Sequence, residues 1–181
     1  MQNLRALSRA EAPTANQPVY DALQSKIGMV PNLYATAANS PVSLKAILEF
    51  GETLGGGGFS NREIEAIALA VSEANACDYC LAAHTALGKM NGFSEEETLD
   101  MRSLSASDEK LNALTRLAQG ITVSRGRPEQ FLIDNFLAAG YSRAALVELI
   151  GFVAVNTFNN YLNNIAGTKI DFPVAPALQT A

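Results

Sequence analysis

The residues best suited to chemistry lie in one short stretch. The chain has two cysteines, Cys77 and Cys80, and a single histidine, His84. On a helix, spacings of three and four residues place side chains on one face within two turns, so both sulfurs and the imidazole are predicted to meet in one pocket. A sulfur in the first helical turn has a lowered pKa, because free backbone N–H groups and the positive end of the helix dipole favour the thiolate. The imidazole can accept the thiol proton.

Two thiols at this spacing also form a reversible redox couple. When one thiol is oxidised to a sulfenic acid or a mixed disulfide, the other can attack it and close a small disulfide ring. The pattern therefore predicts a redox-active pair at Cys77 and Cys80. The residues alone leave open which of the two sulfurs reacts first with a substrate.

A carboxylate on the preceding helix completes the set. Glu65 lies in the segment Ile64 to Leu69, whose other residues are all apolar. A partly buried carboxylate in such surroundings can exchange protons near neutral pH, and it can orient or deprotonate the imidazole of His84. The alternative for Glu65 is an ordinary surface acid or an ion pair at the edge of the core.

Zinc binding is the main chemical alternative for the same residues. Two cysteines, one histidine and one glutamate could supply four tetrahedral zinc ligands. However, both cysteines and the histidine come from one helix and its start, and no second ligand pair is available to join separate elements. We therefore expect no metal site and no organic cofactor. A helical interaction protein with unreactive, buried thiols is the other non-catalytic possibility.

The elements that must position these residues are predicted to be helical throughout. The 3.6-residue period of apolar residues recurs along the chain, whereas sustained strand-like alternation is almost absent, so the fold class is all-α. Ser60 and Glu63 have the spacing of a capping box, which predicts a helix from Asn61 to about Ala74. We expect Asn75 to cap the next helix, which would run to Asn91–Gly92 with Cys77 and Cys80 in its first turn and a half. The other predicted helices cover approximately residues 18–27, 31–38, 41–54, 95–103, 108–123, 128–139 and 143–166.

Length and composition narrow the class of protein. The 181 residues suit one domain, 1–181, with residues 1–17 extended or flexible and a core motif at 60–92. The 48% hydrophobic and 17% charged residues are typical of a packed globular protein. A net charge of −5 without a basic cluster disfavours nucleic acid as a partner. We found no signal-peptide pattern and no run long enough to span a membrane, so we expect a cytoplasmic protein with reduced thiols and no membrane partner.

The motif resembles a known family. Glu65, Cys77-x-x-Cys80 and His84, with an apolar helix before them and Gly88 and Gly92 after them, are similar to the core of the alkylhydroperoxidase AhpD family within the carboxymuconolactone decarboxylase superfamily. Two further segments, Met29 to Tyr34 and Asp171 to Pro173, resemble its peroxidase-related branch.

This resemblance implies an all-α multi-helix bundle with a core helical hairpin, assembled into trimers or hexamers. It implies a thiol-dependent peroxidase in which Cys80 is the peroxidatic thiol, Cys77 the resolving thiol and proton donor, and His84 and Glu65 the proton relay. The expected partners are a small hydroperoxide and a dithiol or lipoyl-type reductant protein. One departure is Tyr79, which stands where the founding peroxidases carry a second histidine and which is a poor base at neutral pH.

Other activities remain as alternatives. A general disulfide oxidoreductase would use the same thiol pair. A decarboxylase acting on carboxymuconolactone is a weaker alternative, because the decarboxylase relatives generally lack the cysteine pair.

Overall fold

The computed structural model describes residues 4–178, and these contain helices but no strands. The predicted all-α class is therefore confirmed. A short 3₁₀ helix, Thr14–Asn16, is followed by the α-helices α1 (Gln17–Ile27), α2 (Asn32–Ala37), α3 (Pro41–Gly55), α4 (Asn61–Ala74), α5 (Asp78–Met90), α6 (Glu95–Ser103), α7 (Glu109–Ser124), α8 (Gln130–Ala138) and α9 (Arg143–Ala166).

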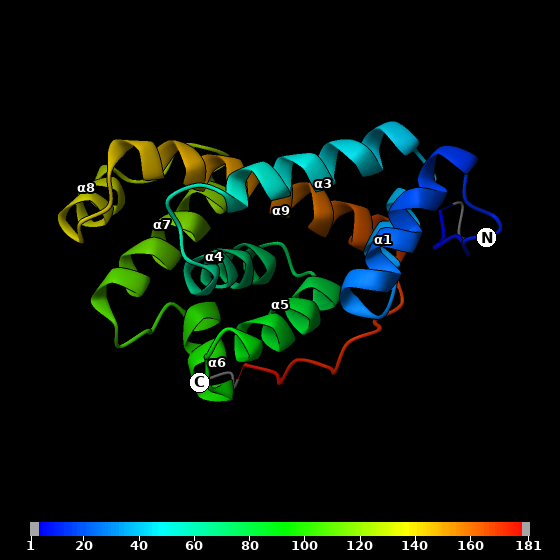
Figure 1. The fold of residues 1–181 in the computed structure, drawn as a ribbon. Helices are drawn as coiled ribbons and strands as arrows, with labels where there is room; N and C mark the ends of the chain where they lie inside the picture. The colour runs from blue at the N-terminus through cyan, green and yellow to red at the C-terminus, as the bar shows by residue number, and fades with distance from the viewer. Residues whose placement is uncertain (1–3, 179–181) are drawn as a thin grey trace.

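Helix α4 occupies the centre of the fold (Figure 1). It packs against α5, α6, α7 and α9, and every residue from Glu65 to Ser72 is buried. A helix that is buried around its circumference must be small and apolar on all sides, which explains the run of alanines, isoleucines and leucines. The predicted capping box forms, since Ser60 accepts a hydrogen bond from the Glu63 N–H and the Glu63 side chain accepts one from the Ser60 N–H.

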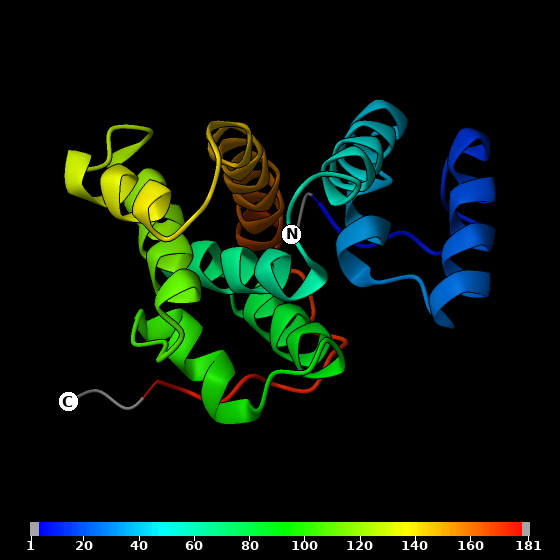
Figure 2. The same ribbon diagram turned by 60° about the vertical axis from the view of Figure 1, so that its left-hand side comes forward.

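The first three helices form a separate layer beside this core (Figure 2). Helices α2 and α3 reach the rest of the fold through α9. The segment before α1, predicted to be extended or flexible, is anchored from residue 4 onward: Leu7 N–H donates to the Ala35 carbonyl (3.0 Å) and Tyr20 Oη donates to the Leu7 carbonyl (2.9 Å). Residues 1–3 of that prediction lie outside the described part of the chain.

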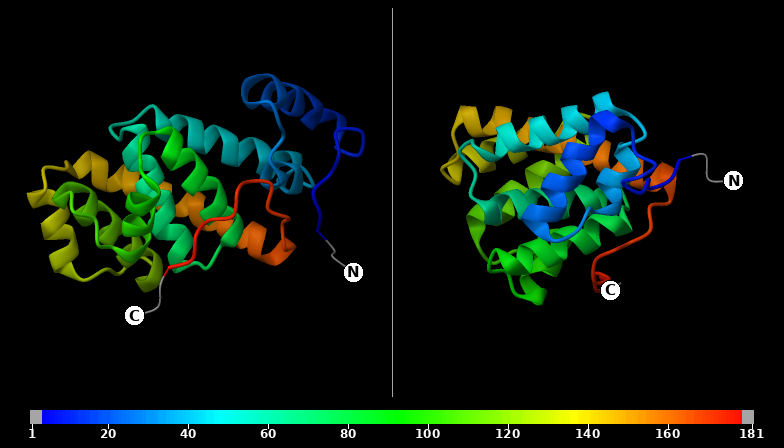
Figure 3. Two further views of the ribbon diagram at one scale, coloured as in Figure 1. Left: turned by 90° about the horizontal axis from the view of Figure 1, so that it is seen from below. Right: turned by 45° about the vertical axis from the view of Figure 1, so that its right-hand side comes forward.

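The C-terminal segment returns across the molecule after α9 (Figure 3). Its Asp171 carboxylate accepts a hydrogen bond from the Asn32 N–H at the start of α2 (2.7 Å). Farther along, the Pro176 carbonyl accepts one from the buried Arg102 of α6 (2.6 Å), whose Nε also bonds Glu73 of α4 (2.7 Å). The Arg102 guanidinium thus joins two helices and the tail.

We predict that Arg102→Met lowers the free energy of unfolding by about 2–3 kcal/mol, because it removes charge-assisted hydrogen bonds and leaves Glu73 and a carbonyl without their buried partner. Urea denaturation followed by circular dichroism measures this. The control is Lys45→Met, which removes an exposed ion pair with Glu49 and should change the free energy by less than about 0.5 kcal/mol. Equal effects of the two substitutions would contradict the role given to Arg102.

Candidate functional site

The cysteine pair lies at the tight junction between α4 and α5. Asn75 ends α4, Ala76 adopts a left-handed conformation (φ 49°), and Cys77 is the N-cap of α5. The Cys77 N–H donates to the Ser72 carbonyl (3.0 Å), so this connection also closes the end of α4. The prediction that Asn75 caps the second helix is wrong, because Asn75 belongs to the C-terminal cap of α4 and the next helix starts three residues later.

Cys77 performs the capping role itself. Its Sγ accepts a hydrogen bond from the Cys80 N–H (3.4 Å), in the place where a serine or aspartate oxygen usually serves. Cys77 thus stands immediately before the helix and Cys80 within its first turn. Both sulfurs are free and buried, and both lie at the end of α5 where backbone N–H groups favour negative charge.

Asparagines of α9 surround the pair from the opposite side. Asn163 Nδ2 donates to Cys80 Sγ (3.2 Å). Asn160 is held by two bonds, because its Oδ1 accepts from Asn75 Nδ2 (2.9 Å) and its Nδ2 donates to Ser72 Oγ (3.2 Å). Sequence reasoning missed these residues. A signal was present, since buried asparagines are disfavoured inside a helix and these repeat on one face of an otherwise apolar segment.

The two thiols differ in acidity. The pKa of Cys77 is lowered to about 7, because the Cys80 thiol can donate to its sulfur and the Cys80 N–H adds a second bond, which together outweigh burial. The pKa of Cys80 is raised, because Cys77 carries the negative charge beside it and because Cys80 is buried. In the reduced pair the first proton is therefore lost from Cys77, and Cys80 keeps its own.

The structure brings Glu65 and His84 into contact. Glu65 Oε2 lies 2.8 Å from His84 Nδ1, and the side chains are 11% and 21% exposed. A Cβ at Gly88 would lie only 3.2 Å from the Phe93 ring but at an ordinary contact distance, 3.9 Å, from the Glu65 Cβ, so Phe93 is the neighbour that favours glycine here. Glu65 is thus the partner of the imidazole, as the sequence suggested, and not a surface acid.

An apolar cavity of about 660 Å³ lies beside His84. Leu33, Tyr79 and Ala83 pack against the two cysteines and also line this cavity, so the sulfurs lie behind its wall. The prediction that both sulfurs and the imidazole share one pocket is therefore only half right: His84 faces the cavity, and the cysteines are covered by its lining. A second hollow, of about 730 Å³, shares Tyr34, His84 and Asn159 with the first.

Two tyrosines complete the surroundings of the pair. Tyr79 Oη accepts a hydrogen bond from the Leu33 N–H (3.1 Å), and its ring meets Phe172 edge-on, so Tyr79 joins α5 to α2 and the tail. Burial raises the pKa of Tyr79, which keeps it a phenol. Burial also raises the pKa of Tyr34, and the negative charges of Cys80 and Glu65 raise it further, so its phenol stands close to both. Sequence reasoning gave no role to Tyr34.

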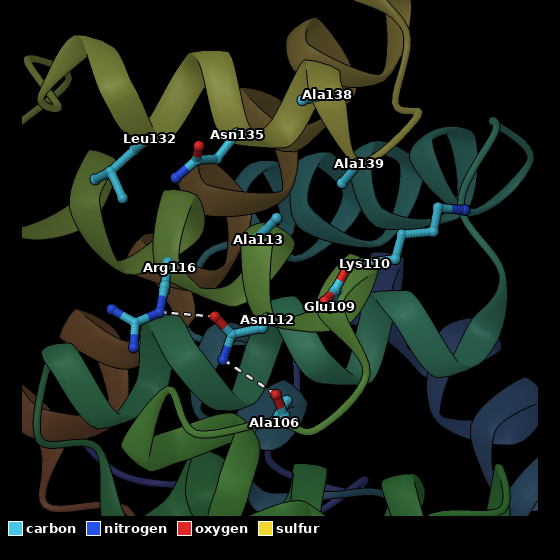
Figure 4. A pocket seen from close by; sticks show the side chains of 10 residues that line it. All are labelled: Ala106, Glu109, Lys110, Asn112, Ala113, Arg116, Leu132, Asn135, Ala138 and Ala139. Atoms are coloured by element: carbon cyan, nitrogen blue, oxygen red, sulfur yellow. Dashed lines mark hydrogen bonds between the residues drawn. The ribbon is translucent and has the colours of Figure 1, made fainter.

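Another cavity, of about 730 Å³, lies between α7 and α8 (Figure 4). Its cations already have partners: Lys110 bonds Glu63 (3.2 Å), and Arg116 donates to Asn112 Oδ1 (2.7 Å) and to the Leu104 carbonyl (3.0 Å). We therefore assign the chemistry to the cysteine site.

Two further properties of residues 4–178 concern metal binding and membrane insertion. No three His, Cys, Asp or Glu side chains come close enough together to hold a metal ion. None of the helices is both long enough and apolar enough to cross a membrane.

The comparisons with known proteins agree with this arrangement. Residues 41–123 match the carboxymuconolactone decarboxylase family. No curated protein is similar enough in sequence to match the chain.

Three solved structures illustrate the similarity of fold. The AhpD-core peroxidase-related protein of Ralstonia eutropha JMP134 is 22% identical, with a TM-score of 0.83 over 92% of this chain and 90% of that one. The peroxidase-related protein of Silicibacter sp. TM1040 is also 22% identical, with a TM-score of 0.80 over 92% of both chains. The debrominase Bmp8, solved in complex with 2,3,4-tribromopyrrole, is 20% identical, with a TM-score of 0.79 over 93% of this chain and 91% of that one.

These likenesses show a shared fold, and the matched segment contains Glu65, both cysteines and His84. The chain therefore carries a segment, residues 41–123, that matches the carboxymuconolactone decarboxylase family, and it has the AhpD-like fold.

Proposed function

We propose that this protein is a thiol-dependent peroxidase that reduces organic hydroperoxides with the Cys77 and Cys80 pair. The observation that carries the proposal is the buried dithiol at the start of α5, where a helix N–H and the Asn163 amide contact the two sulfurs. His84 lies one turn farther along α5, beside the apolar cavity, and it is hydrogen-bonded to Glu65 of α4.

The first chemical step belongs to Cys80. Its proton passes to the Cys77 thiolate. The Cys80 thiolate formed in this way attacks the terminal oxygen of the hydroperoxide. An S–O bond forms, the O–O bond breaks, and the departing alkoxide takes up the proton that Cys77 received, so that it leaves as an alcohol and Cys77 is again a thiolate. Cys80 is then a sulfenic acid.

Cys77 completes the cycle. Its thiolate attacks the sulfenic sulfur, an S–S bond forms, the S–O bond breaks, and hydroxide leaves as water after taking a proton. Two thiols and one hydroperoxide have become one disulfide, one alcohol and one water. An external dithiol or lipoyl-type protein then restores both thiols by exchange, a cycle suited to the reducing cytoplasm.

The resemblance to the AhpD family gives Cys80 the role of the attacking sulfur, and its position supports this role. Cys80 lies on the same face of α5 as His84, and Tyr34, which lines the cavity, stands close to it. Cys77 is fully buried beneath the helix start. The hydrogen-bonded Glu65 carboxylate orients the imidazole, so that His84 is positioned to exchange protons with the departing oxygen.

A second candidate activity is reductive removal of bromine from an aromatic ring. The cavity is lined by Tyr34, Tyr79 and Phe172, which suits a flat ring, and Bmp8 has the same fold. The same dithiol could take the bromine onto Cys80, a proton would replace it on the ring, and Cys77 would then displace bromide to form the disulfide.

We further propose that the chain forms homo-oligomers, trimers or hexamers, through α9. Val147, Ile150, Phe158, Tyr161 and Ile165 are all 43% or more exposed. Their spacing of three, eight, three and four residues puts them on one stripe of the helix, opposite the buried asparagines. An exposed apolar stripe of this length is typical of a protein interface.

The test of the proposed function is a thiol titration of the reduced protein before and after one equivalent of cumene hydroperoxide, with zinc measured on the same sample. We expect two thiols to be lost, both to return with a dithiol, and no zinc. If the thiols do not react with cumene hydroperoxide but are oxidised by tribromopyrrole, debromination is favoured over peroxide reduction. Unreactive thiols with about one zinc per chain would instead indicate a structural metal site.

Single substitutions separate the roles of the sulfurs. Cys80→Ser should abolish peroxide consumption, whereas Cys77→Ser should consume one equivalent and stop with Cys80 as a sulfenic acid, detected by dimedone labelling and mass spectrometry. Equal residual turnover in the two variants would contradict this division of labour.

The acidity of the pair predicts a pH profile. Because the pKa of Cys77 is lowered to about 7, the pair loses its first proton near that pH. The rate of peroxide reduction should fall about tenfold per pH unit below pH 7 and level off above it, as stopped-flow measurements can show. In Cys77→Ser the midpoint should move upward by more than a unit; an unchanged midpoint would assign the titration to another group.

Self-association can be tested by Ile165→Glu, which places a charge in the apolar stripe of α9. We expect light scattering coupled to size exclusion to show an oligomer for the wild type and smaller species for the variant. Val174→Glu, at an equally exposed apolar residue in the tail, is the control and should leave the mass unchanged. A monomeric wild type would contradict the proposal.

A further inference from the structure

Asn163 is the side chain of α9 that contacts a reacting atom. It lies 83 residues from Cys80 along the chain, and its Nδ2 is 3.2 Å from the Cys80 sulfur. Asn163 is 3% exposed and Cys80 is 2% exposed, so water does not compete for this bond. A neutral amide donor in a dry site stabilises an anion more than a neutral group.

The backbone holds Asn163 in place from both sides. Its carbonyl accepts hydrogen bonds from the N–H groups of Gly167 and Thr168, which close the end of α9. One turn earlier, Asn160 is fixed by Asn75 and Ser72 on the α4 side of the junction. The amide is therefore presented to the sulfur by a rigid part of the fold.

Cys80 needs such a donor. The Cys80 N–H at the helix start serves the sulfur of Cys77, not that of Cys80. The other titratable groups near Cys80 are Cys77 and the phenols of Tyr34 and Tyr79, with His84 one turn farther along α5 and paired with Glu65 of α4. None of these places a hydrogen-bond donor on Cys80 Sγ in the structure, whereas Asn163 does.

We propose that Asn163 is a catalytic residue whose amide, 3.2 Å from the Cys80 sulfur, stabilises the Cys80 thiolate once the proton has left it. That this thiolate attacks a hydroperoxide rests on the proposed function, whereas the stabilisation of the thiolate by the amide does not. The same donor is positioned to bond the sulfenate oxygen that forms on Cys80.

The test measures the pKa of a single thiol. In the Cys77→Ser background, Cys80 is the only cysteine, and its thiolate absorbs near 240 nm, so a pH titration gives its pKa directly. Asn163→Leu keeps the approximate size but removes the donor, and it should raise the Cys80 pKa by about one unit. Asn163→Asp keeps the shape and adds a like charge, and it should raise the pKa by about one to three units.

Asn164→Asp is the matched control. It adds the same charge one residue later, on the exposed side of α9, and it also removes the Asn164 hydrogen bond to the Asn75 carbonyl (2.9 Å), but it should move the Cys80 pKa by less than half of the Asn163→Asp shift. Circular dichroism confirms that each variant is folded. If Asn163→Leu does not fold, the Cys80 pKa of the near-isosteric Asn163→Asp variant tests the role of Asn163.

The proposal is overturned if folded Asn163 variants leave the Cys80 pKa within about 0.3 unit of the reference, or if Asn164→Asp shifts it as much as Asn163→Asp does. Failure of the peroxidase proposal is a separate outcome. If the Asn163 variants raise the Cys80 pKa but the protein does not react with hydroperoxides, the role of Asn163 is supported and the proposed substrate is wrong.

Discussion

The sulfur of Cys77 caps helix α5, and much of the structure depends on that one contact. The junction after α4 has room only for Asn75, left-handed Ala76 and Cys77 before the next helix begins. Because the capping atom is a thiol and not a hydroxyl, the group that completes the helix also carries charge and redox chemistry.

The central position of α4 sets the other half of the site. A helix buried on all sides can carry a carboxylate only where a polar partner meets it, and His84 of α5 is that partner. Core packing and the contact between Glu65 and His84 are thus parts of one arrangement.

The asparagines of α9 provide polar contacts in the region where α5, α4 and α9 meet. Buried amides are costly without partners, and Asn160 has two, Asn75 and Ser72, while the Asn163 Nδ2 bonds a sulfur. One face of α9 therefore supports the thiols, while its opposite face presents exposed apolar side chains to the surface.

The sequence by itself determined the helical class, most helix boundaries, and the grouping of Cys77, Cys80, His84 and Glu65. These follow from short-range rules: the 3.6-residue period, capping residues next to the helices they start, and side-chain spacings of three and four along one helix. Only the tertiary structure decided which residue caps α5, that the sulfurs lie behind the cavity wall, and that Asn163 contacts Cys80. Those facts depend on how α4 ends against α5 and on a contact across 83 residues, which local patterns cannot encode because packing between distant segments sets them.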